Sequence, residues 1–203
     1  MSTVLEKAGK MRDNYLLYLT FINRKLEKHF ADQAPYIYCH KGCARCCQYG
    51  DYPFNHLEIQ YILEGFSKLP EDKKRIILKN IEKTKQEKIN FQGEQFTYQC
   101  PFLINNECSV YDYRGIICRS FGLISSRDDE NSKIPFCAYE GLNYSNVLDP
   151  ETNTISEEKF LALNIEQEPL AYKVRYKDLI SDKFEEVFNL KFGEVKSLID
   201  WFM

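Results

Sequence analysis

The chain has 203 residues, a length that suits one domain with a sizeable hydrophobic core, with or without a helical appendage. Hydrophobic residues make up 44% of it and charged residues 28%, which is typical of a soluble globular protein and excludes a low-complexity chain. The net charge of −3 gives no reason to expect nucleic acid or an anionic membrane among its partners.

The first ten residues have neither the long apolar core nor the cleavage pattern of a signal peptide. No stretch reaches the apolar length that spans a bilayer. We therefore expect a cytoplasmic protein without a membrane partner. Thiols stay reduced in the cytoplasm, so the eight cysteines indicate metal or redox chemistry rather than a disulfide scaffold, which a chain of this length does not need.

A long amphipathic helix is predicted over residues 3–31. Its apolar residues recur at steps of three and four positions: Val4, Ala8, Met11, Tyr15, Tyr18, Ile22, Leu26 and Phe30. We expect this stripe to pack against the cysteine-bearing part of the protein. After Pro35 the chain is expected to run extended through residues 36–38 and to deliver Cys39.

Four thiols lie within nine residues of the next segment, Cys39-His-Lys-Gly-Cys43-Ala-Arg-Cys46-Cys47. A turn at Gly42 would lead into a short helix. Cys43, Cys46 and Cys47 would then share one helix face at positions i, i+3 and i+4, with Cys39 approaching from the preceding turn.

The setting of these thiols favours metal binding. A helix N-terminus and the cations Lys41 and Arg45 are expected to lower the thiol pKa, and the thiolate is the form that binds metal. Cys46 and Cys47 point in different directions, so they bind different metal atoms or only one of them is a ligand. His40 is a further candidate, although eight cysteines leave little need for it.

Two more helices are predicted after this segment. Asn55 and Glu58 have the spacing of a capping box, and the helix that they open has as its inward residues Leu57, Tyr61, Ile62 and Phe66. Pro70 opens the following helix, over residues 71–90, whose apolar stripe consists of Ile76, Ile77, Ile81 and Ile89.

From residue 91 to about residue 146, short aromatic and β-branched pieces alternate with turn residues. Because this segment lacks the periodicity of a sheet or helix, we expect metal–thiolate bonds to hold its loops. Residues 143–153 are predicted to be a linker. A capping box of Thr154 and Glu157 predicts a helix to about residue 167, and the apolar residues after residue 184 predict two short helices.

The second set of cysteines is Cys100, Cys108, Cys118 and Cys137, separated by seven, nine and eighteen residues. This spacing does not fit the paired C-x2-C knuckles of a zinc ribbon. Eight thiols can serve two four-coordinate sites, or one cluster with spare ligands. We expect Cys39, Cys43 and Cys46 to form one site with a fourth ligand from the second set. Cysteine-only ligation selects zinc, an iron–sulfur cluster or cuprous copper, and the sequence does not choose among them.

The spacing Cys39-x3-Cys43-x2-Cys46 also matches the ligands of radical S-adenosylmethionine enzymes, in which three cysteines leave one iron of a four-iron cluster open. Arg45 stands where those enzymes usually have an aromatic residue. No alternation of strands and helices predicts their barrel, so we do not expect their fold.

A longer run of motifs resembles a known family. Residues 39–137 contain Cys-x3-Cys-x2-Cys-Cys, Cys-Pro-Phe-Leu, Cys-Ser-Val-Tyr, Tyr-x-Arg and Cys-Arg-x-Phe-Gly. In these they resemble the YkgJ-type cysteine-cluster family, which is described as zinc- or iron-chelating. The family has eight characteristic cysteines, and its candidate metal ligands here are Cys39, Cys43, Cys46, Cys47, Cys100, Cys108, Cys118 and Cys137. The one departure is Gly115, where the family usually has proline.

The resemblance also implies a cofactor, since the family includes the flagellin lysine-N-methylases, for which an iron–sulfur cluster and S-adenosylmethionine are implicated. The candidate cofactor-binding residues are Arg114, Arg119, Tyr111 and Glu58. The two arginines flank Cys118 and can offset thiolate charge or hold a carboxylate. Tyr111 and Glu58 match family positions and can line a pocket. Structural ion pairs, core packing and helix capping explain these four residues about as well.

We thus expect a mainly α protein whose helices surround an irregular, metal-organised, cysteine-rich centre. Residues 1–146 are expected to form the N-terminal helix and the metal-binding domain, and residues 147–203 a helical extension packed on it. Three functions fit. The chain is a metalloprotein that binds a 4Fe-4S cluster or zinc, a methyltransferase that uses the cluster and S-adenosylmethionine on a protein or peptide, or a non-catalytic metal carrier or structural zinc module.

Overall fold

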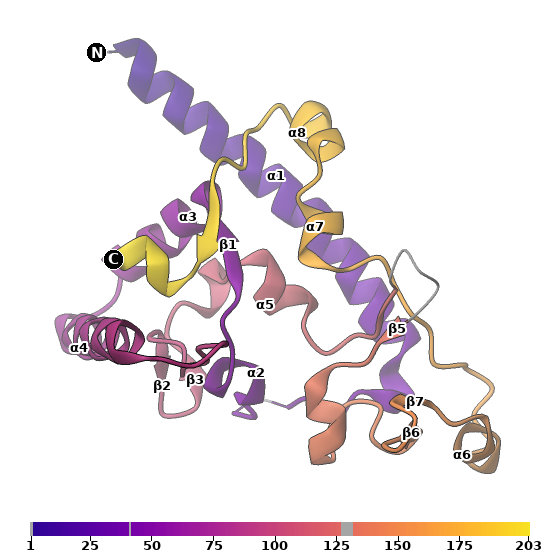
Figure 1. Ribbon diagram of the computed structural model, residues 1–203. Coiled ribbons are helices and arrows are strands. Elements are labelled where there is room, and N and C mark those ends of the chain that lie inside the picture. The colour runs from indigo at the N-terminus through magenta and orange to yellow at the C-terminus, as the bar shows by residue number, and fades with distance from the viewer. Residues whose placement is uncertain (1, 41, 127–131) are drawn as a thin grey trace. The chain divides into compact units, whose positions relative to one another are not determined.

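The computed structural model describes residues 2–40, 42–126 and 132–203, and for residues 2–5 and 8 it describes the backbone alone (Figure 1). The sequence predicts roles for the side chains of Lys41, Val4 and Ala8. These side chains are not among the described parts of the chain. The described part is mainly helical with small two-stranded pairings, which confirms the predicted mainly α class. None of the helices in it has the length and the apolar character that crossing a membrane requires.

Two compact units make up the chain, and each is built from two separate stretches of sequence. The first unit contains Met1–His40 and Arg119–Leu190, and the second contains Lys41–Cys118 and Lys191–Met203. The predicted boundary between residues 146 and 147 thus falls inside the first unit. The thiols divide as well, because Cys39 and Cys137 belong to the first unit and the other six to the second.

The first unit is organised along the helix α1. Its elements are α1 (Ser2–Asp32), η1 (Ala34–Tyr36), β4 (Ser125–Ser126), β5 (Ser132–Lys133), η3 (Phe136–Glu140), β6 (Leu148–Asp149), β7 (Thr154–Ile155), α6 (Glu157–Ala162), α7 (Tyr176–Leu179) and α8 (Asp182–Phe188). Tyr18 of α1 is fully buried, and its ring lies 5.6 Å and 5.5 Å from those of Phe184 and Phe188 in α8. The Tyr18 hydroxyl donates to the carbonyl of Leu179. The helix predicted over residues 3–31 is therefore confirmed, and its inward stripe is buried at Tyr15, Tyr18, Ile22 and Leu26.

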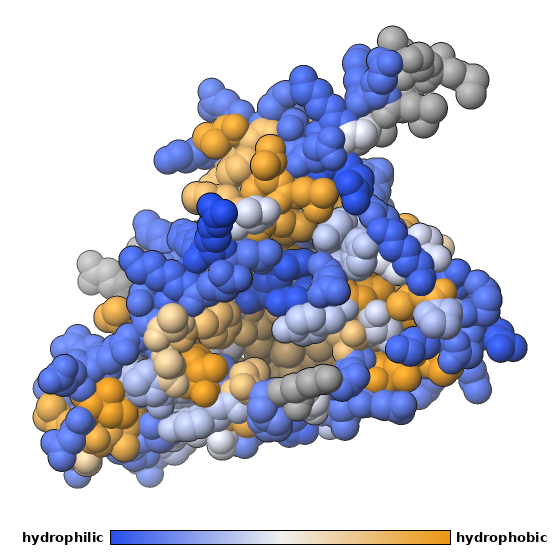
Figure 2. Space-filling model, turned by 180° about the vertical axis from the view of Figure 1, so that it is seen from behind, coloured by the Kyte–Doolittle hydropathy of each residue, from blue (hydrophilic) through white to orange (hydrophobic). Residues whose placement is uncertain are grey.

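An apolar surface remains exposed over α1 and α8, where Figure 2 shows orange side chains gathered between hydrophilic ones. The large exposed apolar residues of these two helices are Leu17, Phe21 and Val187. They lie on the outer side of the aromatic packing between α1 and α8, because the ring of Phe21 is within 5.9 Å of Phe184 while Phe21 itself is 44% exposed.

Residues 143–153 are not the linker that their composition predicted. Asn143, Tyr144 and Val147 are fully buried, and the strands β6 and β7 pair around the following turn. Polar residues are abundant here because they build that turn. The side chain of Asp149, for example, accepts backbone N–H groups across it.

The helix predicted from Thr154 to about residue 167 is shorter than expected. Ser156 is its N-cap and accepts the N–H of Lys159 at 3.2 Å, while Thr154 lies in β7. The helix α6 ends at Ala162, so the predicted capping box and the predicted extension are both wrong. A serine two residues closer to the helix supplies the same hydroxyl in a better position.

The second unit contains the helices that the capping signals predicted. Its elements are α2 (Arg45–Gln48), β1 (Pro53–Asn55), α3 (His56–Ser67), α4 (Glu71–Asn90), β2 (Leu103–Ile104), β3 (Glu107–Cys108), η2 (Tyr111–Tyr113), β8 (Val195–Ser197) and η4 (Ile199–Phe202). The helix α5 (Ile116–Ser120) begins in this unit and crosses into the sequence of the first. The predicted capping box of Asn55 and Glu58 is confirmed at the start of α3, and α4 follows Pro70 as predicted.

The inward face of α4 differs from the predicted stripe. Ile77 and Ile81 are buried together with Thr84, which continues their face at helical spacing. Ile76 and Ile89 are 42% and 59% exposed, so their assignment to the core was wrong. When a helix has few apolar residues, the surface against which it packs determines which of its faces is buried.

The segment after Gly193 was predicted to be helical and instead begins with a strand. The strand β8 pairs antiparallel with β1, with Pro53 opposite Ser197. The turn η4 follows, and its Trp201 donates a hydrogen bond from Nε1 to the Phe54 carbonyl at 3.0 Å. The core of this unit consists of Phe54, Ile59, Ile62, Ile77, Ile81, Tyr98, Phe102, Val110, Leu198 and Ile199.

Candidate metal centre

The first cysteine segment forms a shorter helix than its spacing predicted. Gly42 has φ +85°, as expected for a turn, but Ala44 also adopts a left-handed conformation with φ +52°. The helix α2 therefore begins at Arg45 and holds Cys46 and Cys47, while Cys43 precedes it. The single helical face of three thiols was thus a wrong prediction, because the left-handed conformation of Ala44 separates Cys43 from the helix.

A hairpin brings the next two cysteines to this helix. The N–H of Cys100 donates to the carbonyl of Cys47 at 2.7 Å, and the N–H of Leu103 donates to the carbonyl of Cys100 at 3.0 Å. Leu103 then pairs with Cys108 across the strands β2 and β3. The intervening turn consists of two asparagines with positive φ, a conformation that asparagine tolerates and that tight hairpins require.

The fourth thiol comes from the helix α5, which carries Cys118. Cys100, Cys108 and Cys118 all pack against the same hydrophobic core, which also contains Phe102 and Val110. The helix α2, the two sides of the following hairpin and the helix α5 thus contribute one thiol each. We call this set the four-thiol cluster: Cys46, Cys100, Cys108 and Cys118.

The members of the four-thiol cluster lie close enough to affect one another's charge. Burial is the main cause that raises the pKa of Cys100, and the charges of Cys118, Cys108 and Cys46 raise it further. Burial is also the main cause for Cys118, followed by Cys108, Cys46 and Glu58, while Arg114 opposes them. Bringing four thiolates together in this place is therefore costly without a cation.

A further effect favours the protonated form of the Cys46 thiol. A hydrogen bond with the Cys47 side chain is the largest cause that raises the pKa of Cys46, followed by burial and by the charge of Cys47. The sequence had predicted lowered thiol pKa values in this segment. That prediction was wrong for Cys46, because its hydrogen bond with the Cys47 side chain and its burial both favour the protonated thiol.

All eight cysteines are free thiols. Among the residues that the structure describes, no three side chains of histidine, cysteine, aspartate or glutamate are arranged to hold a metal ion. The donor set of the four-thiol cluster nevertheless fits a soft metal, since four thiolates are the ligands of structural zinc sites and of iron–sulfur clusters. Metal binding would draw these thiols together, as is common where site formation and local folding are linked.

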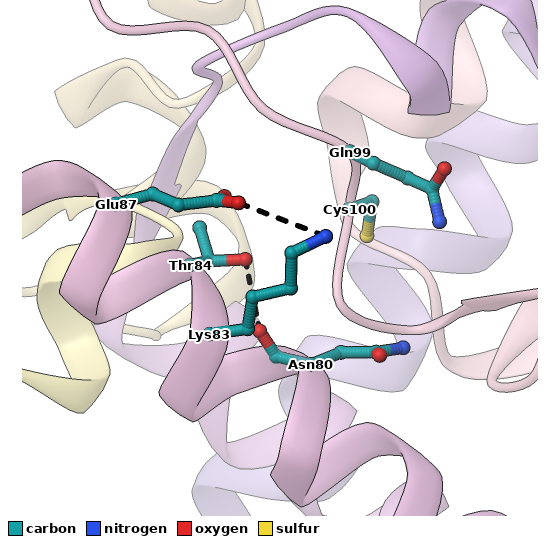
Figure 3. A pocket seen from close by; sticks show the side chains of 6 residues that line it. All are labelled: Asn80, Lys83, Thr84, Glu87, Gln99 and Cys100. Carbon is teal, nitrogen blue, oxygen red and sulfur yellow. Dashed lines mark hydrogen bonds and ion pairs between the residues drawn. The ribbon is translucent and has the colours of Figure 1, made fainter.

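A small cavity of about 90 Å³ reaches Cys100 from the side of α4. Figure 3 shows it between the loop that carries Gln99 and Cys100 and the residues of α4, which are Asn80, Lys83, Thr84 and Glu87. Lys83 and Glu87 form an ion pair of 3.6 Å at its edge. Asn80 donates to the carbonyl of Pro101 at 3.1 Å, which ties the loop to the helix.

The two cysteines of the first unit have different surroundings. Cys39 is exposed, whereas Cys137 is buried in η3. The neighbouring His40 is exposed, and its Nδ1 lies 3.2 Å from the Tyr38 carbonyl. The backbone of Cys39 is held by Asn143, whose Oδ1 accepts the N–H groups of Tyr38 and Cys39, both at 2.9 Å.

The four predicted cofactor-binding residues lie in different settings. Arg114 covers the Tyr111 ring at 3.8 Å from its centroid, and Tyr111 is 60% exposed. Arg119 belongs to the first unit and donates from Nη1 to Asn23 at 3.1 Å. Glu58 is fully buried and accepts hydrogen bonds from backbone groups. Only Arg114 and Tyr111 therefore combine exposed area with a position in the unit of the four-thiol cluster.

Sequence reasoning missed Asn143. This residue is fully buried, and its Nδ2 donates to the Gly122 carbonyl at 3.0 Å. Asparagine is common in turns, so its position before other polar residues pointed to a linker. The one available signal was the apolar Tyr144 and Val147 nearby, which a solvated linker does not need.

A comparison with family models gives one match. The model described as "Putative zinc- or iron-chelating domain" (CxxCxxCC) matches residues 38–138, a range that includes all eight cysteines. No curated protein and no solved structure was found to be significantly similar to the chain.

Proposed function

This chain belongs to the CxxCxxCC family through residues 38–138, and we propose that its four-thiol cluster binds one zinc ion or one 4Fe-4S cluster. The observation that carries the proposal is the packing of Cys100, Cys108 and Cys118 against one core, with Cys46 near enough to raise the pKa of Cys100 by its charge. Both centres take four cysteine ligands. A cytoplasmic location would keep these thiols reduced, as binding requires.

Backbone hydrogen bonds and the apolar core position the thiols of this centre. The hydrogen bond from Cys100 to Cys47 and the β2–β3 hairpin fix three of the segments against one another. Cys100, Cys108 and Cys118 are partly buried against the apolar core, which displaces part of the water that would solvate their thiolates, so a bound cation would be the main partner of these charges. Such a cation stabilises the deprotonated thiols and would offset the burial and the repulsion that raise the pKa of Cys100 and Cys118.

The direct test is metal analysis and visible absorption of protein purified without oxygen. We expect about one equivalent of zinc, or about four of iron with matching sulfide and a visible absorption band. Cys108→Ser should remove this metal. Ser109→Ala, which changes the neighbouring side chain, should retain it. Wild-type protein without metal, or Cys108→Ser protein with full metal content, would overturn the proposal.

A further variant separates this grouping of ligands from the one that the sequence predicts. The sequence groups Cys39 with Cys43 and Cys46, whereas Cys39 lies in the first unit and the four-thiol cluster in the second. We expect Cys39→Ser to retain the metal of the four-thiol cluster. Loss of that metal from Cys39→Ser but not from Cys108→Ser would favour the grouping predicted from the sequence.

Arg114 favours a second candidate function, methyl transfer from S-adenosylmethionine. Its guanidinium charge opposes the raised pKa of Cys118, and the exposed Tyr111 ring lies beneath it. A guanidinium next to a metal centre can bind the carboxylate of a cosubstrate in a bidentate way. An exposed aromatic ring beside it offers a flat surface for stacking.

Calorimetric titration of metal-loaded protein with S-adenosylmethionine tests this candidate. We expect heat of binding for the wild type and weaker binding for Arg114→Lys, which keeps the charge but loses the planar fork. Lys68→Arg, at the neighbouring Tyr113, is the matched control. If no heat is observed and the absorption spectrum does not change, a metal-binding module without this cosubstrate remains.

A further inference from the structure

Glu58 is a carboxylate with no exposed surface, located in the first turn of α3. Burying a charge is costly unless hydrogen bonds compensate for it. Its oxygen Oε2 accepts from the backbone N of Asn55 at 2.9 Å and from Nδ2 of Asn55 at 2.7 Å. The other oxygen, Oε1, accepts from the backbone N of Ile116 at 2.6 Å.

These contacts go beyond helix capping. A capping box needs only two reciprocal bonds. The Asn55 N–H donates to one carboxylate oxygen of Glu58, and the Glu58 N–H donates to the Asn55 side-chain oxygen. The bond to Ile116 joins residues 58 positions apart and holds the first residue of α5. The side chain of Glu58 therefore connects the start of α3 with the start of the helix that carries Cys118.

The sequence on the α5 side is suited to this approach. A Cβ atom on Gly115 would lie 2.8 Å from Oε1 of Glu58 and would also collide with the Phe54 ring. Glycine at position 115 thus lets the carboxylate reach the Ile116 N–H. Cys118 follows two residues later, and the charge of Glu58 contributes to its raised pKa after burial, Cys108 and Cys46.

We propose that Glu58 is a positioning residue that fixes α5, so that the Cys118 thiol faces the other members of the four-thiol cluster. This inference rests on the proposed function, because it concerns a ligand of that centre. Glu58 acts through the backbone and not as a metal ligand, since both of its oxygens are already hydrogen-bonded to N–H groups. Partners that orient ligands in this way typically affect metal affinity by about 10- to 100-fold.

The test uses cobalt(II), whose absorption spectrum reports how many thiolates bind it. We expect the full-length wild type to bind cobalt through four thiolates. Glu58→Ala should bind it through three, with affinity lower by about 10- to 100-fold. Iodoacetamide followed by mass spectrometry should then label Cys118 in the cobalt-loaded variant but not in the cobalt-loaded wild type.

Asn55→Ala is the matched control. It removes the capping side chain and its bond to Oε2 of Glu58, but keeps the bonds from the backbone N–H groups of Asn55 and Ile116 to the carboxylate. It should retain four thiolates. Glu58→Gln keeps the length of the side chain and one acceptor oxygen, so we expect an intermediate affinity for cobalt. If Glu58→Ala does not fold, the affinity of Glu58→Gln tests the proposal instead.

Four outcomes separate the two proposals. Reduced affinity of both Glu58 variants with Cys118 labelled supports the positioning role. Four thiolates and unchanged affinity in both variants would overturn it while leaving the metal centre intact. An equal loss in Asn55→Ala would also overturn it, because capping alone would then explain the effect. A wild type that shows no thiolate–cobalt absorption would overturn the proposed function and this inference together.

Discussion

Asn143 holds Cys39 by its backbone, with a hydrogen bond of 2.9 Å from the Cys39 N–H to the Asn143 side-chain oxygen. The same oxygen accepts the N–H of Tyr38, and the Asn143 amide group donates to Gly122. A Cβ atom on Gly122 would lie 2.6 Å from that amide nitrogen. One fully buried side chain thereby satisfies three backbone groups from two segments of the first unit.

Replacing Asn143 with alanine should be strongly destabilising. Each buried backbone group left without a partner costs about 1–3 kcal/mol, so we expect the free energy of unfolding to fall by about 3 kcal/mol or more. Urea unfolding measures the loss. Asn146→Ala is the control, because the Asn146 side-chain oxygen has no hydrogen-bond partner among the described residues. Similar losses in the two variants would show that the hydrogen bonds of Asn143 do not matter.

Gly115→Ala should destabilise the second unit by about 1–3 kcal/mol, because the added methyl group collides with Phe54 and Glu58. Gly9→Ala provides the opposite case. Nothing lies within 4 Å of a Cβ atom at Gly9, which is inside α1, so alanine should stabilise the protein by about 0.5–1 kcal/mol. Thermal unfolding of both variants checks the two signs, and a neutral Gly115→Ala would contradict the close contact.

Removing the metal should loosen residues 98–118 more than α1. The hydrogen bond from the Cys100 N–H to the Cys47 carbonyl connects the loops of the cysteine hairpin to α2. Thiolate–metal bonds would supply the rest of their stability. We expect a chelator to speed hydrogen exchange in peptides from 98–118, measured by mass spectrometry, while peptides from 14–30 keep their protection. Equal exchange with and without metal would argue against a structural role for the centre.

Stability should also decrease as the pH falls below neutrality, because of His29. Burial is the main cause that lowers its pKa from 6.5, with Lys25 and Lys28 adding to the effect and Asp32 opposing it. Its ring lies 3.9 Å from that of Tyr172. The unfolded chain takes up a proton near pH 6.5, before the folded chain does, so the free energy of unfolding decreases as the pH falls through that value.

The variant His29→Phe keeps a ring against Tyr172 and removes the titration. Its free energy of unfolding should therefore change less than that of the wild type between about pH 7.5 and 5.5. Urea unfolding at several pH values within this window measures the difference. Parallel pH profiles for the two proteins would show that His29 does not cause the loss.

Local signals in the sequence predicted local structure well. The apolar stripe of α1 and the capping box of Asn55 and Glu58 each involve residues within one or two helical turns, and both are confirmed. Their physical causes, burial of one helix face and satisfaction of terminal N–H groups, need no information from distant residues. The predicted helix boundaries were wrong where two nearby residues could both cap the helix with a hydroxyl group, as Thr154 and Ser156 could for α6.

The grouping of thiols could not be predicted in the same way. Spacing suggested that Cys39, Cys43 and Cys46 belong together, and that grouping remains a prediction. What spacing did not reveal is that Cys46 lies near enough to Cys100, more than fifty residues later, to affect its charge. The bond between Cys39 and Asn143 spans 104 residues. Contacts of this kind depend on how loops return to a shared core, and no periodicity in the sequence records them.

The pairing of β8 with β1 has a consequence for synthesis of the protein. The strand β1 emerges from the ribosome early, but its partner lies at Val195–Ser197. At about 5–20 residues per second, several seconds pass between the two. The thiols of the second unit are therefore translated before the strand that completes this unit. In a nascent chain, the second unit would still be incomplete when its thiols first meet cellular metal or a protein that delivers it.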